Sequence, residues 1–123
     1  MLGVKAGDYV AVPDQCFHAV AISVMTCGAV PVFVDTRPDD FNLDAKALQK
    51  TLGSRPVKAV IAVDNYGTPA DWRSLSMVTK KHDVPLIVDA CESLGATRIN
   101  QHVIDYADVV VVSFSFTLSL IHI

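Results

Sequence analysis

The sequence lacks any concentration of lysine or arginine. Its 10 basic and 13 acidic residues give a formal net charge of −3. Nucleic acids and anionic membranes bind proteins through clustered positive charge, so we expect neither as a partner. No apolar run approaches the roughly 20 residues that span a membrane. Lys5 and Asp8 interrupt the first apolar residues, which argues against a signal peptide.

Cysteine is scarce as well. The three cysteines, Cys16, Cys27 and Cys91, are odd in number and widely spaced, and no CxxC pair occurs. This pattern favours buried thiols in a reducing compartment over a disulfide framework or a zinc site, so we expect a cytoplasmic protein. The four histidines show no metal-ligand spacing, and the HExxH, GxSxG, GxGxxG and GxxxxGK[ST] motifs are all absent.

What the sequence does contain is a regular alternation of apolar runs and helical segments. The predicted strands are residues 9–12, 30–34, 57–63, 85–89 and 109–114. The predicted helices are residues 15–26, 42 or 44 to 52, and 71–82, the first of them apolar on nearly every side and therefore largely buried. This order predicts an α/β fold, with a mostly parallel central sheet and helices on both faces.

Several predicted strands end in a carboxylate or a hydroxyl group, at Asp35, Asp64, Asp89 and Ser113. Open α/β sheets bind their ligands at the carboxyl ends of the strands. Aspartate is also a common turn residue after a strand. Asp89 follows the uninterrupted apolar run of residues 85–88, which is typical of a strand covered on both faces. The residues alone leave both roles open for each side chain.

Five segments carry a more specific signal through their order and spacing. They are GDYVAVP at 7–13, GAVPVFVD at 28–35, YGTPAD at 66–71, DACESLGA at 89–96, and Asp108 followed by SFSFT at 113–117. Together they resemble the DegT/DnrJ/EryC1/StrS aminotransferases, the sugar-aminotransferase group of fold-type I pyridoxal-phosphate enzymes. The resemblance implies that the chain is a slice of the large domain of such an enzyme, with pyridoxal 5'-phosphate as the cofactor of the parent protein.

The resemblance also implies roles for four cofactor-binding residues. Asp89 would pair with the pyridine nitrogen, and a buried carboxylate there would hold that nitrogen protonated. Glu92 would lie near the ring hydroxyl, Phe17 would stack on the ring, and Ser113 would contact the phosphate. Without the resemblance, Phe17 would be interpreted as a core residue and Ser113 as a strand-end turn residue. Asp64 stands where the family commonly has histidine, and we assign it no role.

The sequence departs from the family at its end. The family places its Schiff-base lysine five residues after the serine, at the position that is Leu118 here. Leucine has no nitrogen, so the expected catalytic residue is absent and the chain alone should be inactive. We therefore divide the chain into a partial PLP-binding large domain, residues 1–117, and a non-family tail, residues 118–123, that a truncation or read-through would explain.

For the parent protein, the resemblance implies transfer of an amino group, commonly from glutamate, to a nucleotide-linked keto sugar, within a homodimer. A PLP-family dehydratase, or a relative that has lost catalysis, is a second possibility, which differs at position 118. An unrelated doubly wound binding module is a third. Its receiver-like form needs an acidic cluster after the first strand and a late lysine, and the sequence has only Asp14 and no such lysine.

Overall fold

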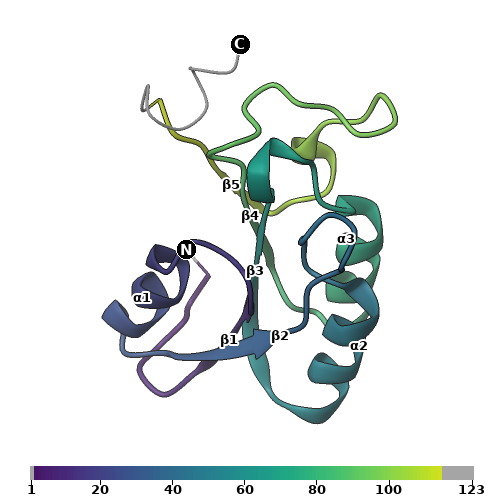
Figure 1. Ribbon diagram of the computed structural model, residues 1–123. Helices are drawn as coiled ribbons and strands as arrows, with labels where there is room; N and C mark the ends of the chain where they lie inside the picture. The colour runs from purple at the N-terminus through teal and green to yellow at the C-terminus, as the bar shows by residue number, and fades with distance from the viewer. Residues whose placement is uncertain (1, 115–123) are drawn as a thin grey trace.

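The computed structural model describes residues 2–114, and a five-stranded parallel sheet is its centre (Figure 1). The strands are β1 (Tyr9–Pro13), β2 (Val30–Val34), β3 (Val57–Val63), β4 (Leu86–Asp89) and β5 (Val109–Val111). Their order in the sheet is β2-β1-β3-β4-β5, and every adjacent pair is parallel. The sheet confirms the predicted architecture.

The middle strand, β3, is the most completely covered. It pairs with β1 on one side and β4 on the other, and five of its seven residues are buried. β-Branched side chains favour such a pleated surface with cover on both faces. In the register with β4, Val63 lies opposite Asp89. The carboxyl ends of β3 and β4 are therefore level, and the residues that follow both strands meet at one edge.

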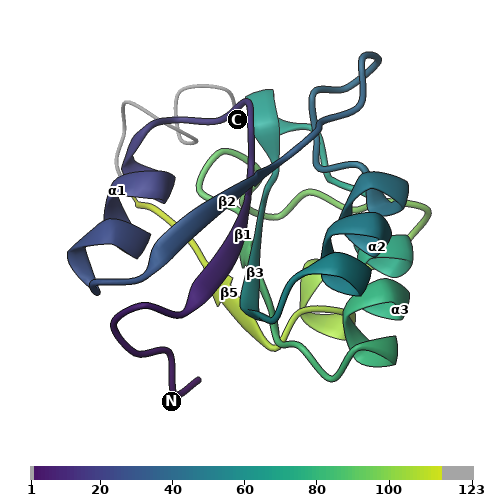
Figure 2. The ribbon, with the colours of Figure 1, turned by 90° about the horizontal axis from the view of Figure 1, so that it is seen from below.

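Helices cover both faces of the sheet (Figure 2). Helix α1 (Ala19–Thr26) lies on one face, whereas α2 (Ala45–Ser54) and α3 (Trp72–Lys81) lie together on the other. Asp44 and Asp71 are the N-cap residues that precede α2 and α3, and their side chains accept hydrogen bonds from the backbone amides of Lys46 and Ser74, respectively. Each cap satisfies an amide that has no partner within the helix.

Helix α1 differs from its prediction. It begins at Ala19 rather than residue 15, and only Val20 and Val24 are buried. Ile22 and Met25 are 51% and 62% exposed, so the expectation of a largely buried helix was wrong. The physical reason is that, among residues 2–114, no second helix lies beside α1 on its face of the sheet, so only the side of the helix that points to the strands is covered.

Two other elements end at least two residues from their predicted ends. Helix α2 passes through Gly53 and ends at Ser54, because Gly53 does not adopt the left-handed conformation that ends many helices. Strand β5 ends at Val111, three residues before the predicted end, and Phe114 is 75% exposed. Beyond Val111 the described chain has no neighbouring strand to pair with, so the ladder stops there.

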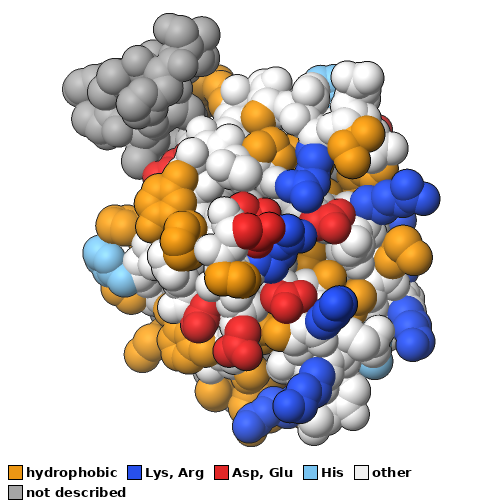
Figure 3. All heavy atoms as spheres, turned by 45° about the vertical axis from the view of Figure 1, so that its right-hand side comes forward, with side chains coloured by type: hydrophobic (Ala, Val, Ile, Leu, Met, Phe, Trp, Pro, Cys, Tyr) orange, Lys and Arg blue, Asp and Glu red, His pale blue; other side chains and the backbone are white. Residues whose placement is uncertain are grey.

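The surface mixes charges of both signs. On the face shown in Figure 3, lysine and arginine side chains lie beside aspartate and glutamate side chains. Among residues 2–114, no helix is long and apolar enough to cross a membrane, and no group of histidine, cysteine or acidic residues is arranged to hold a metal ion.

Two leucine-sized side chains of α3 provide a test of the core. Leu75 is fully buried, whereas Met77, on the opposite side of the same helix, is 65% exposed. We expect Leu75→Ala to lower the free energy of unfolding by about 2–5 kcal/mol, because it leaves a cavity. The control Met77→Ala should change it by less than about 0.5 kcal/mol. Urea unfolding followed by circular dichroism measures both, and equal effects would contradict the difference in burial between the two side chains.

Candidate functional site

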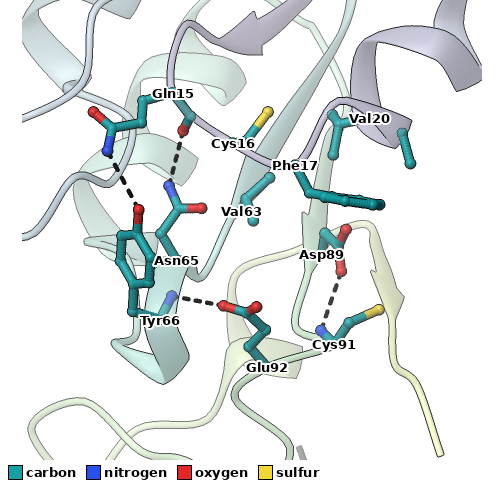
Figure 4. A pocket seen from close by; sticks show the side chains of 11 residues that line it. Gln15, Cys16, Phe17, Val20, Val63, Asn65, Tyr66, Asp89, Cys91 and Glu92 are labelled. Atoms are coloured by element: carbon teal, nitrogen blue, oxygen red, sulfur yellow. Dashed lines mark hydrogen bonds between the residues drawn. The ribbon is translucent and has the colours of Figure 1, made fainter. Parts of the chain in front are cut away.

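A cavity of about 530 Å³ opens at the carboxyl edge of the sheet (Figure 4). Its walls come from the segment after β1, the end of β3 with the residues that follow it, and the turn after β4. The lining residues are Gln15, Cys16, Phe17, Ala19, Val20, Val63, Asn65, Tyr66, Asp89, Cys91 and Glu92. The volume is that of a small-molecule site, in the place where open α/β sheets bind ligands.

Asp89 is the last residue of β4 and contributes a carboxylate to this cavity. One of its oxygens, Oδ1, accepts a hydrogen bond from the backbone amide of Cys91 at 3.1 Å. Burial raises the pKa of the Cys91 thiol to about 12, and a hydrogen bond to Asp89 and the negative charge of that residue add to the effect. At neutral pH the thiol is therefore protonated and stays a donor toward Asp89.

Phe17 lies on the same side of the cavity as Asp89 (Figure 4). Its side chain is 70% exposed, and its ring centroid is 4.3 Å from that of His18. The alternative interpretation of Phe17 as a core residue is therefore wrong. An exposed aromatic ring at the edge of a cavity offers a flat apolar face to a ligand, and its role in stacking on a cofactor stays a prediction.

Glu92 reaches the cavity from the turn after β4. Its Oε2 accepts a hydrogen bond from the backbone amide of Tyr66 at 2.7 Å. Tyr66 has a φ of +57°, a left-handed conformation that is uncommon for a tyrosine, and its hydroxyl accepts a hydrogen bond from Gln15 at 3.4 Å. Glu92 is thus fixed against the loop after β3 at the wall of the cavity.

Ser113 is the predicted cofactor residue that does not join this group. It follows β5, is half-buried, and is not among the residues that line the cavity. Its proposed contact with a phosphate stays a prediction. The lysine expected at position 118 and the tail from 118 to 123 lie outside the described residues. The structure thus brings together Phe17, Asp89 and Glu92.

Asp64, for which the sequence indicated no role, is the most connected polar side chain near the site. Asp64 directly follows the last residue of β3 and is fully buried. Its Oδ1 accepts hydrogen bonds from the Ala70 amide and the Trp72 indole, both at 2.9 Å, and its Oδ2 accepts one from the Ser93 hydroxyl at 2.6 Å. Burial raises the pKa of the Asp64 carboxyl, and the nearby charge of Asp89 acts in the same direction, against these hydrogen bonds.

Two asparagines, which the sequence analysis also did not identify, join the loops around the cavity. The side-chain amide of Asn65 donates to the backbone carbonyls of Gln15 and Phe41, at 3.0 and 2.7 Å. The Asn42 side chain accepts from the Asn65 amide at 2.9 Å and donates to the Thr68 carbonyl at 3.0 Å. These contacts span 23 to 50 residues of sequence, so only the fold reveals them.

This arrangement defines a class of protein. A parallel sheet with helices on both faces is the fold of the large domain of fold-type I PLP-dependent aminotransferases, to which the solved relatives belong. In this chain a cavity at the carboxyl edge of the sheet is lined by Phe17, Asp89 and Glu92, among others. The chain belongs to the DegT/DnrJ/EryC1/StrS aminotransferase family, whose sequence model matches residues 1–120. Membership of this family overturns the alternative of an unrelated binding module.

Individual relatives show how much of a whole enzyme is represented. GDP-perosamine synthase from Caulobacter vibrioides is 42% identical over 96 residues, which cover 78% of this chain and 26% of that protein. UDP-2-acetamido-2-deoxy-3-oxo-D-glucuronate aminotransferase from Pseudomonas aeruginosa is 36% identical over 113 residues, which cover 92% of this chain and 31% of that protein. The chain therefore spans less than a third of either curated relative.

A solved relative contains the cofactor. The crystal structure of NtdA from Bacillus subtilis with bound cofactor PMP matches with a TM-score of 0.79 and 28% sequence identity. The match covers 89% of this chain and 24% of that one.

The buried Asp64 carboxyl predicts a pH dependence of stability. Because its pKa in the folded state is raised above the unfolded value, its contribution to stability is complete below the unfolded pKa and is lost as pH rises through the folded pKa. We expect the stability of the wild-type chain relative to Asp64→Asn, which cannot ionise, to fall as pH rises from about 4 toward neutrality. The change is at most about 1.4 kcal/mol per pH unit.

Urea unfolding at a series of pH values, with both proteins measured side by side, provides this comparison. Titration of the other carboxyl groups is common to the two chains and cancels in the difference. A stability difference that grows with pH would mean that the hydrogen bonds to Asp64 outweigh its burial and that its pKa is lowered instead of raised.

Proposed function

We propose that this chain is part of a PLP-dependent aminotransferase that transfers an amino group to a nucleotide-linked keto sugar. The observation that carries the proposal is the meeting of Phe17, Asp89 and Glu92 in one cavity at the carboxyl edge of the sheet. A flat, charged pyridine ring needs an apolar surface against one face and an acceptor for its ring N–H, and these residues offer both.

The residues present therefore fit the cofactor. Asp89 would hold the ring nitrogen, and the Cys91 amide and thiol orient its carboxylate from within the same turn. Phe17 would cover one face of the ring and exclude water from it, and Glu92 would lie near the ring hydroxyl. We extend the proposal to Ser113 as a contact of the phosphate. When bound, pyridoxal 5'-phosphate supplies an electron-withdrawing ring that stabilises negative charge at the carbon that loses a proton.

The kind of substrate follows from the relatives. The names of the Caulobacter and Pseudomonas proteins refer to GDP- and UDP-linked sugars, and the latter names a 3-oxo sugar as the acceptor. By extension, we propose an acceptor that is a keto sugar on a nucleoside diphosphate, an amino donor such as glutamate, and a homodimer in the cytoplasm for the parent protein.

A second candidate rests on one residue. Position 118 is Leu118, where the family resemblance expects lysine. A leucine there can neither bind the cofactor covalently nor move a proton, so a relative that has lost catalysis is the alternative. The residues from 118 to 123 would then be genuine, instead of the product of truncation or read-through.

Sequencing the source gene across codon 118 and both flanks separates the two candidates. Under the first proposal, the codon encodes lysine and the reading frame continues. The protein expressed from that frame, supplied with PLP and glutamate, should then release 2-oxoglutarate when a UDP-linked 3-oxo sugar or a GDP-linked keto sugar is added. A leucine codon followed by a stop after position 123 would favour the inactive relative.

In the protein expressed from that frame, Asp89→Asn tests the electrostatic role. An asparagine keeps the size of the side chain and removes the charge that would hold the ring nitrogen protonated. We expect kcat for amino transfer to fall by about a hundredfold or more. The edge strand β2 offers a control in Phe33→Leu, because Phe33 is exposed and is not among the residues that line the cavity, and this variant should keep kcat within about twofold. An unchanged kcat in Asp89→Asn would refute the assigned role.

A further inference from the structure

Two side-chain hydrogen bonds join residues 64 and 66, after β3, to residues 92 and 93, in the turn after β4. The Ser93 hydroxyl donates to Asp64 Oδ2 at 2.6 Å, and the Tyr66 backbone amide donates to Glu92 Oε2 at 2.7 Å. In the first bond the turn supplies the donor, and in the second the loop does. We call these four residues the loop clasp. The loop clasp joins the two segments at two points. Its residues are adjacent in the turn, at 92 and 93, and two positions apart in the loop, at 64 and 66.

The backbones at the loop clasp are in close contact. Gly67 has a φ of +74°, and a Cβ at this position would lie 3.1 Å from the backbone carbonyl oxygen of Glu92. Tyr66, immediately before it, also has a left-handed backbone. Left-handed conformations at non-glycine residues cost free energy and persist only where surrounding contacts enforce them. The contacts between Glu92 and this loop are such constraints.

The two bonds of the loop clasp differ in environment. Asp64 and Ser93 are 0% and 6% exposed, whereas Glu92 is exposed and the Tyr66 side chain is 71% exposed. Fixing an exposed glutamate in one rotamer costs side-chain entropy, and water competes for its hydrogen bond. The bond between Glu92 and Tyr66 therefore depends on the turn being held in place by something else. The buried bond from the hydroxyl of Ser93, the next residue, is one such constraint, beside the backbone bond from the Ser93 amide to the Ala90 carbonyl.

Asp64 is also held by hydrogen bonds from outside the loop clasp. Its other oxygen accepts from the Ala70 amide and the Trp72 indole, which belong to the start of α3. The carboxyl group is thus anchored to the helix on one side and holds the Ser93 turn on the other. A hydroxyl group bound to an anchored acceptor in a buried place makes a stronger constraint than any contact of Glu92 with solvent-exposed groups.

We propose that Asp64 is a positioning residue of the candidate site, which acts through Ser93 to keep the Glu92 carboxylate on Tyr66 and at the wall of the cavity. What Glu92 then contacts rests on the proposed function, whereas the loop clasp is a property of the chain by itself. Asp64 is not among the residues that line the cavity, and its proposed action on Glu92 passes through the turn after β4.

Amide hydrogen exchange of the 123-residue chain, measured by NMR without cofactor or substrate, tests the proposal. In Ser93→Ala we expect protection of the Tyr66 amide to fall by about fivefold or more, although Ser93 does not touch that amide. The Val60 amide, which donates to the Pro85 carbonyl between β3 and β4, should change by less than about twofold. A general loss of stability would lower both protections by the same factor and would overturn the proposal.

Two further variants isolate the hydroxyl group. Ser93→Thr keeps the donor and should retain the Tyr66 protection, so an equal loss in the threonine and alanine variants would assign the effect to packing and overturn the proposal. Ser76→Ala is the matched control: a buried serine, 3% exposed, is removed from α3 instead of from the loop clasp. Its ratio of Tyr66 to Val60 protection should match that of the wild-type chain.

The variant Glu92→Ala, on the other bond of the loop clasp, tests the proposal even if Ser93→Ala does not fold. Coupling between two bonds is mutual, so Glu92→Ala, at an exposed position, should lower the protection of the Ser93 amide relative to Val60. An unchanged Ser93 protection would overturn the proposal. These measurements need no cofactor, so they are independent of the activity assay. If the loop clasp is found but the protein has no aminotransferase activity, only the proposed function is refuted. If the enzyme is active but the loop clasp is not found, only this inference is refuted.

Discussion

The parallel pairing of β3 with β4 is the interaction on which the rest of the structure depends. It places Val63 opposite Asp89, and the backbone amide of Asp64 donates to the Asp89 carbonyl at 3.0 Å just beyond the end of β3. A shift of one residue would turn every side chain of β4 to the other face of the sheet. Asp89 would then leave the cavity, and the turn that carries Glu92 would lose its contact with the loop after β3.

Burial of the Asp64 carboxyl is the main electrostatic cost of this arrangement. No lysine or arginine pairs with it among the described residues, so its compensation comes entirely from hydrogen-bond donors. Three donors on two oxygens leave little freedom to the group, which is why a residue buried after a strand can fix segments on both sides of it.

Local rules account for what the sequence predicted well. Some features depend only on neighbours within a few residues: the apolar run before Asp89 and the helix caps Asp44 and Asp71. The strand β4, the starts of α2 and α3, and the candidate carboxylate Asp89 therefore follow from the sequence. The family resemblance added Phe17 and Glu92, whose positions in the cavity no local pattern specifies. What the sequence could not provide depends on contacts between distant segments. The asparagine bridges join loops far apart in the chain, and the left-handed Tyr66 follows from the position of Glu92, 26 residues later. The exposure of α1 has a similar origin, since apolar composition does not say how many sides of a helix find a neighbour.

The indole of Trp72 has a consequence for how this molecule can be observed. It is the single tryptophan of the sequence, is 1% exposed, and donates its N–H to Asp64. The chain thus carries one tryptophan fluorophore, and the indole nitrogen is bonded to the carboxyl group that joins α3 to the turn after β4. Its emission spectrum reports from a dry environment beside a titratable acid, so an unlabelled sample signals optically when that junction opens or changes its charge.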